Sequence, residues 1–118
     1  MKLLIVDDST VIRRTVERAL AQQATEIRTA SDGVEALSVF AEFAPDLVTM
    51  DLTMPNLDGL GCIRGMLEQR PEARIIVITA LADKPTAIEA VEIGAQGFLV
   101  KPFTERRLQE EATVILSE

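Results

Sequence analysis

The segment DLVTMDLTMPNLDG, residues 46–59, joins an apolar run to an aspartate and then to a loop that contains proline and glycine. The run Asp46–Met50 is short and apolar, and turn-forming residues bound it, which predicts a buried strand. Asp51 follows this strand, and Thr53–Asp58 is predicted to be a loop that carries Pro55. A charge beside a buried strand is costly unless it has a partner. Asp51 is therefore the first candidate for a functional residue.

Three other apolar runs end on polar residues in the same way. They are LLIV at 3–6 before Asp7 and Asp8, IIVI at 75–78 before Thr79, and GFLV at 97–100 before Lys101. Such runs, separated by helix-like stretches, are typical of parallel strands buried on both faces. The carboxyl ends of these strands meet at one crevice. We therefore expect three carboxylates, a hydroxyl and an ammonium to lie close together.

Strand and helix patterns alternate five times along the chain. The predicted strands are Lys2–Val6, Thr25–Ala30, Asp46–Met50, Ile75–Thr79 and Gly97–Val100. The predicted helices are one capped by Ser9 or Thr10, then Val34–Ala44, Gly59–Gln69, Lys84–Ile93 and a last one capped by Thr104. This pattern predicts a (βα)₅ α/β fold, a doubly wound parallel sheet with right-handed crossovers. In flavodoxin-like sheets of this kind the strand order is 2-1-3-4-5, which makes the first and third strands neighbours.

Composition limits the classes of protein that the chain can belong to. Its 118 residues predict one domain spanning 1–118, and 47% hydrophobic residues argue against disorder. The net charge of −7 argues against nucleic acid and anionic membranes as partners. Histidine is absent, which excludes histidine metal sites and nucleophile pairs. The single Cys62 is interpreted as a packing residue. One cysteine, together with no membrane-length apolar run and no signal peptide, predicts a cytoplasmic protein.

The expected cluster suits a divalent cation and a phosphoryl group. Mg²⁺ binds carboxylates together with phosphate oxygens, so Asp7, Asp8 and Asp51 are its candidate ligands, joined by the main-chain carbonyl of Thr53. Asp51 is the candidate nucleophile for the phosphoryl group. Lys101 would neutralise the phosphoryl oxygens, and the Thr79 hydroxyl would donate a hydrogen bond to one of them.

Each residue also has an ordinary structural explanation. Asp8 can be a helix cap, Thr79 a plain β-branched strand residue and Lys101 a solvated charge at a strand end. A coincidence of such explanations at the ends of four strands is less plausible than one shared site.

These motifs resemble the receiver domain of two-component response regulators over the whole chain. The resemblance rests on VDDS at 6–9, the segment at 46–59, VITA at 77–80, GA at 94–95 and FLVKPF at 98–103. It implies that Asp51 is the phosphoacceptor for a sensor histidine kinase, that Asp7 and Asp8 organise Mg²⁺, and that Lys101 is the phosphate counter-charge. It also implies that Thr79 and Phe98 switch together and change the surface of the fourth helix, fifth strand and fifth helix. A cis peptide bond between Lys101 and Pro102 is a further implication.

Within that family the chain resembles the chemotaxis CheY group. VDDSTVIRR, VTMDLTMP and GAQGFLVKPF carry this likeness, which implies a role in motility and a downstream target such as the flagellar switch. The last helix lacks the later basic residues of dimerising transcription-factor receivers, so we expect a monomer. The expected protein is a signalling switch rather than an enzyme, although it catalyses its own phosphorylation and dephosphorylation.

The sequence also fits other interpretations. The chain can be the receiver half of a longer regulator, such as a methylesterase or a transcription factor. A haloacid-dehalogenase-like phosphatase would need a second aspartate two residues after its nucleophile, where this chain has Thr53 after Asp51 and Ser9 after Asp7. A pseudo-receiver that acts without phosphorylation is disfavoured because all the site residues are present.

Overall fold

Five parallel strands form one sheet in the order β2-β1-β3-β4-β5, which is the order expected for a flavodoxin-like sheet. The computed structural model describes residues 1–54 and 58–118. The strands are β1 Lys2–Val6, β2 Glu26–Ala30, β3 Leu47–Asp51, β4 Ile75–Thr79 and β5 Gly97–Val100. The order reverses between β1 and β3, whose carboxyl ends therefore border an open crevice in the sheet.

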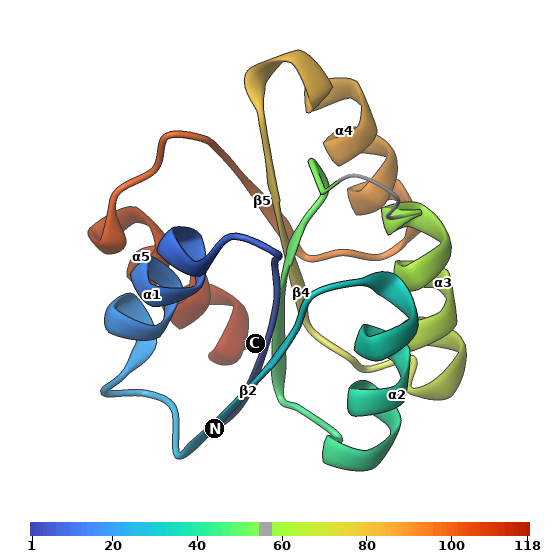
Figure 1. Ribbon diagram of the computed structural model, residues 1–118, viewed down its shortest axis with the longest axis horizontal. Helices are drawn as coiled ribbons and strands as arrows, with labels where there is room; N and C mark the ends of the chain where they lie inside the picture. Colours follow the sequence, from blue (N-terminus) through green and yellow to red (C-terminus); the bar gives the residue numbers. More distant parts are fainter. Residues whose placement is uncertain (55–57) are drawn as a thin grey trace.

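Helices cover both faces of the sheet (Figure 1). They are α1 Thr10–Leu20, α2 Gly33–Phe43, α3 Gly59–Gln69, α4 Lys84–Ile93 and α5 Glu105–Leu116. α1 and α5 lie together on one face, and α2, α3 and α4 lie on the other. Within the part of the chain that the structure describes, no helix is long and apolar enough to cross a membrane.

Side-chain caps explain where most of the helices begin. A serine, aspartate or threonine oxygen accepts the N–H of a first-turn residue, which satisfies a donor that has no partner inside the helix. The four caps are Ser9 for Ile12, Asp32 for Glu35, Asp58 for Gly61 and Thr104 for Arg107. Of the two caps that the sequence left open for the first helix, Ser9 is the one observed.

Three predicted elements were displaced by one residue at one or both ends, and one short element was missed. β2 begins at Glu26 rather than Thr25, β3 is Leu47–Asp51 rather than Asp46–Met50, and α2 is Gly33–Phe43 rather than Val34–Ala44. Ala44 caps the end of α2 with a left-handed φ of 49°, its N–H donating to the carbonyl of Phe40, and Pro45 after it cannot continue the helix. A 3₁₀ helix at Leu81–Asp83 precedes α4 and has no apolar period that could predict it. Pro55, which the sequence placed in the loop after β3, lies outside the described residues.

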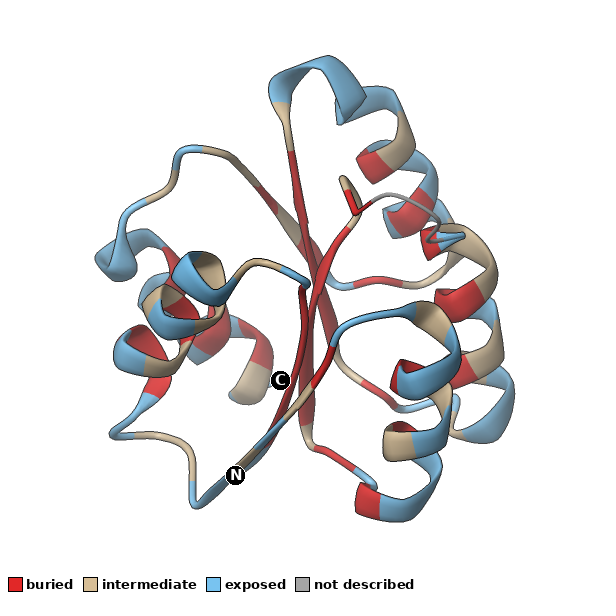
Figure 2. Ribbon diagram, in the orientation of Figure 1, coloured by how far each residue is buried: buried red, intermediate tan, exposed pale blue. Residues whose placement is uncertain are grey.

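The central strands β1, β3 and β4 form the buried centre of the molecule, with exposed residues on the outer sides of the helices and on the edge strand β2 (Figure 2). One apolar cluster lies between the sheet and α2, α3 and α4, and includes Phe40, Met50 and Ile63. The other lies between the sheet and α1 and α5, and includes Leu20 and Leu108. Packing on both faces fixes the strands, and therefore the residues at their carboxyl ends, in place.

A hydroxyl inside this core has no hydrogen-bond partner among the residues that the structure describes. Thr49 lies in the middle of β3, is 1% exposed, and its hydroxyl oxygen is unpaired. Its neighbours in register, Ile5 and Ile76, are apolar. A methyl group in place of this hydroxyl avoids the cost of burying an unsatisfied polar atom. We expect Thr49→Val to raise the free energy of unfolding by about 1 kcal/mol in urea titrations, whereas Thr49→Ala, which leaves a cavity, should lower it.

Candidate functional site

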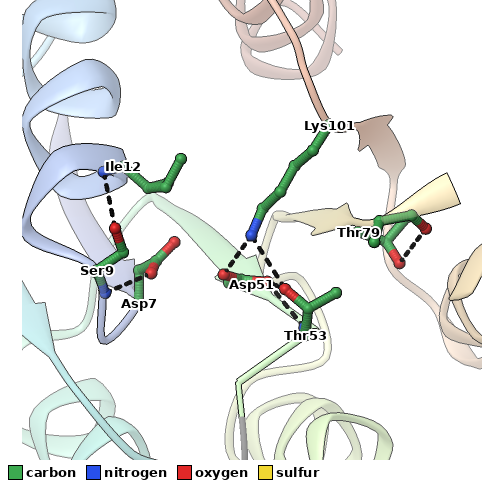
Figure 3. A network of polar contacts seen from close by, with 8 residues as sticks. Asp7, Ser9, Ile12, Asp51, Thr53, Thr79 and Lys101 are labelled. Atoms are coloured by element: carbon green, nitrogen blue, oxygen red, sulfur yellow. Dashed lines mark hydrogen bonds and ion pairs between the residues drawn. The ribbon is translucent and has the colours of Figure 1, made fainter. Parts of the chain in front are cut away.

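Asp51 is the centre of the candidate site. It is the last residue of β3, lies opposite Ile78 of β4 in register, and is only 3% exposed. Its side chain lies among Asp7, which follows β1, Thr53, which follows β3 itself, and Lys101, which follows β5 (Figure 3). The sequence placed Asp51 directly after the strand; in the structure it belongs to the strand, whose pairing with β4 holds its backbone.

Both carboxylate oxygens of Asp51 accept hydrogen bonds. The Lys101 ammonium donates to Oδ2 at 2.7 Å, and its side chain is 26% exposed. The Thr53 N–H donates to Oδ1 at 2.8 Å, and the Thr53 hydroxyl also contacts Oδ1. Lys101 Nζ lies 3.0 Å from the same hydroxyl oxygen. Asp51, Thr53 and Lys101 thus form a closed triangle of polar contacts.

Asp7 supplies a second buried carboxylate at the end of β1. It is 1% exposed, and its Oδ1 accepts the N–H of Ser9 at 2.8 Å. Its Oδ2 is buried without a hydrogen-bond partner. Burial and the nearby charge of Asp51 raise the pKa of Asp7 to about 6, although the Ser9 N–H opposes this.

The pKa of Asp51 shifts in the opposite direction. Burial alone would raise it, but the hydrogen bonds from Lys101 and Thr53 outweigh burial and hold the pKa of Asp51 below its usual value. The two neighbouring acids therefore differ in character, with Asp51 held as an anion by its donors and Asp7 left short of them.

The residues present fit a divalent cation. Oxygens of Asp7, Asp8 and Asp51 lie within 4.8 Å of one another, and Asp8 is exposed to solvent. The unpaired Oδ2 of Asp7 is the atom that a cation would satisfy, and hard oxygen donors of this kind suit Mg²⁺. Thr53 lies two residues after Asp51 and donates its N–H to that carboxylate, which makes its carbonyl a further candidate ligand.

Thr79 and Phe98 stand apart from this network. Thr79 is fully buried at the end of β4, and its hydroxyl donates to the carbonyl of Ala80 at 3.2 Å rather than to a group of the triangle. Phe98 is half-buried in β5 and packs against the core. The Lys101–Pro102 peptide bond that follows β5 is cis, as the resemblance implied.

Two contacts of the site were not foreseen from the sequence. Thr53 was predicted to contribute its main-chain carbonyl to a metal site, and in the structure its hydroxyl also contacts both Asp51 and Lys101. Ser9 was predicted as a helix cap, and its N–H also donates to Asp7. A hydroxyl residue two positions after a strand-end aspartate is the sequence feature that could have suggested the first of these contacts, because short polar side chains there readily form local turns.

Comparison with known proteins agrees with this arrangement. A family model described as the response regulator receiver domain matches residues 3–113. The chain belongs to this family. Receiver domains are signalling switches of two-component systems, and the resemblance that the motifs suggested is thereby confirmed.

Individual relatives of this receiver are named for different roles. It is 37% identical to a chemotaxis protein CheY from Thermotoga maritima, over 92% of each chain. It is 39% identical to a probable transcriptional regulator ycf27 from Porphyridium aerugineum, over 98% of this chain but 48% of the relative. The receiver thus spans about half the length of several curated relatives that it matches. The crystal structure of the receiver domain of NtrX from Brucella abortus superposes with a TM-score of 0.89 at 33% identity, covering 98% of both chains.

Proposed function

We propose that this receiver, as one unit spanning residues 1–118, is a phosphorylation-activated switch whose acceptor is Asp51. The observation that carries the proposal is the polar surroundings of that carboxylate: Asp51 is a buried anion with the Lys101 ammonium at 2.7 Å, and the adjacent Asp7 has an unpaired oxygen. A buried acid kept ionised by its donors is suited to act as a nucleophile. The phosphoryl donor is a sensor histidine kinase in the cytoplasm, as membership in the family suggests.

The reaction is an in-line displacement at phosphorus. An oxygen of Asp51 forms a bond to the phosphorus, the bond between phosphorus and the donor's imidazole nitrogen breaks, and the nitrogen keeps the bonding electrons and takes up a proton. The product is an acyl phosphate on Asp51 and a neutral histidine on the kinase. Lys101 already lies where negative charge collects on the transferred group, so it can stabilise that charge without moving far.

Mg²⁺ bound by Asp7, Asp8, Asp51 and the Thr53 carbonyl would neutralise phosphoryl oxygens during the transfer.

Thr79 is suited to the conformational switch that follows the transfer. Its hydroxyl has only a 3.2 Å bond to the carbonyl of Ala80 to give up, so it can turn to a phosphoryl oxygen after transfer. Space vacated by that turn would be open to the half-buried Phe98, which couples the site to β5.

The responding surface is a cleft over α4, β5 and α5. It has a volume of about 680 Å³ and is lined by Val91, Phe98, Phe103, Arg107 and Glu111 among others. Its apolar walls and single ion pair between Arg107 and Glu111 suit a protein target. A change in Phe98 would alter this cleft directly.

Two kinds of relative support two different biological outputs for this receiver. The CheY relative, matched over nearly its whole length, favours a free-standing chemotaxis receiver with a target such as the flagellar switch. The relatives that are about twice as long favour the alternative of a receiver that controls an attached output domain, such as a methylesterase or a transcription factor. A haloacid-dehalogenase-like phosphatase stays the less favoured alternative, because Thr53 occupies the position of its second aspartate.

Intact mass after incubation with acetyl phosphate tests the proposal. The wild-type chain should gain one phosphoryl group with Mg²⁺ and none when the metal is chelated. Peptide mapping after borohydride reduction of the acyl phosphate should place the group on Asp51. Absence of an adduct in Mg²⁺, together with no binding of beryllofluoride, would refute the proposal and favour the pseudo-receiver interpretation.

A further inference from the structure

Thr53 makes contacts with Asp51 and Lys101 that a simple loop residue would not make. Its hydroxyl oxygen lies within hydrogen-bond distance of Asp51 Oδ1 and, at 3.0 Å, of Lys101 Nζ. A hydroxyl has one donor and two acceptor sites, whereas a lysine ammonium can only donate and a carboxylate can only accept. The hydrogen-bond directions are therefore fixed: Lys101 donates to Thr53, and Thr53 donates to Asp51.

The backbone holds the Thr53 side chain in this place. The Thr53 N–H donates to the same Oδ1 atom, so residue and carboxylate are joined twice. Asp51 itself is held by β3, and the following Leu52 N–H donates to the carbonyl of Ile78 in β4 at 2.8 Å. The backbone that carries the Thr53 hydroxyl is therefore held in place, whereas the long side chain of Lys101 extends to this hydroxyl from the end of β5.

We propose that Thr53 is a positioning residue that fixes the Lys101 ammonium beside Asp51 before any phosphoryl group arrives. Lysine is flexible and strongly hydrated, and fixing its four-carbon stem costs conformational entropy. Because Thr53 and Asp51 both accept from Lys101, its side chain has already lost that conformational entropy in the unphosphorylated protein. An incoming phosphoryl group then meets a charge that is already in place, which is the general advantage of preorganisation. The proposal rests on the proposed function of Asp51 as acceptor, but its structural part concerns the unphosphorylated protein.

The first test observes the lysine ammonium itself, without metal or phosphate. The chain has lysines at positions 2, 84 and 101, so the side-chain ¹⁵Nζ region of its NMR spectrum is simple. An ammonium held by two acceptors exchanges slowly with water and gives a sharp ¹⁵Nζ–¹Hζ signal at low temperature, whereas the exposed Lys84 should give none. We expect the Lys101 signal in wild type, its loss in the near-isosteric Thr53→Val, and its return in Thr53→Ser. Lys101→Met assigns the signal.

The second test measures affinity for beryllofluoride in the presence of Mg²⁺, as a phosphoryl mimic. Thr53→Val should bind it about tenfold more weakly than wild type, the size expected for loss of one well-placed hydrogen bond to a charged group. Thr53→Ser should stay within about twofold of wild type, because it keeps the hydroxyl. Backbone amide spectra confirm that both variants are folded.

The outcomes of the two tests separate the two proposals. An unchanged Lys101 signal in Thr53→Val, or mimic affinity equal to or tighter than that of wild type, would overturn the positioning role. If wild type shows the Lys101 signal and Thr53→Val loses it, but no chain binds the mimic, then Thr53 holds Lys101 as inferred and the proposed acceptor function fails instead.

Discussion

Asp51→Asn should take up no phosphoryl group from acetyl phosphate under conditions in which the wild-type chain is modified. The substitution keeps the shape of the side chain but replaces an anionic oxygen with a neutral amide that is a poor nucleophile. It also removes the anion that Lys101 contacts at 2.7 Å, so the ammonium loses its charged partner. The expected change is complete loss of the adduct, measured by intact mass over a time course with Mg²⁺ present.

Asp32→Asn is the matched control for this experiment. It carries the same chemical change at a helix cap that lies outside the triangle, and asparagine caps helices about as well as aspartate. It should be phosphorylated at the wild-type rate. An adduct that persists in Asp51→Asn would show that another carboxylate, Asp7 or Asp8 being the nearest, is the true acceptor or a substitute for it.

The fold was predictable because the sequence is locally consistent. Continuous apolar runs such as Ile75–Thr79 leave no solvent face for a strand, so both faces must be covered, which requires helices on both sides. The alternating polar and apolar residues of β2 place it at an edge, where it is found. The strand order came from flavodoxin-like sheets rather than from this chain, since apolar runs carry no information about which strands are neighbours.

The positions of the site residues were predictable, but their contacts were not. Residues at the carboxyl ends of parallel strands must converge, and this brought Asp7, Asp51 and Lys101 together. Side-chain torsions decide the rest. Nothing in the sequence distinguishes a Thr79 hydroxyl bonded to a neighbouring carbonyl from one that points at Asp51. The place of Thr53, two residues after Asp51, favours a local contact with that carboxylate but does not indicate that the same hydroxyl also meets Lys101.

The acidic cluster also lowers the stability of the fold near neutral pH, mainly through Asp7. An acid whose folded pKa exceeds its ordinary value binds its proton more tightly in the folded state than in the unfolded one. The pKa of Asp7 rises from 3.8 to about 6, because of burial and then the nearby Asp51 charge. The stability that Asp7 contributes is therefore fully present below its ordinary pKa of 3.8 and is lost as the pH rises through its folded pKa of about 6. Near neutral pH the ionised Asp7 weakens the fold.

Asp7→Asn should accordingly stabilise the metal-free protein by about 2 kcal/mol near pH 7. The amide keeps an oxygen to accept the Ser9 N–H, and its nitrogen can donate to the Asp51 carboxylate in place of a charge that repels it. Urea unfolding should show the gain shrinking toward zero near pH 4, where wild-type Asp7 is already protonated. Asp8→Asn, the same change at an exposed neighbour, should alter stability by less than about 0.5 kcal/mol.

The same variant should lose the response to metal. In the wild type, millimolar Mg²⁺ is expected to raise the free energy of unfolding, because a ligand that binds only the folded state stabilises it by mass action. Asp7→Asn removes the carboxylate whose Oδ2 is left without a partner, so added Mg²⁺ should have little effect on it. A gain in stability with the metal response intact would mean that Asp7 is not a ligand. If the metal response disappeared without any gain in stability at neutral pH, then burial would not raise the pKa of Asp7 in the folded protein.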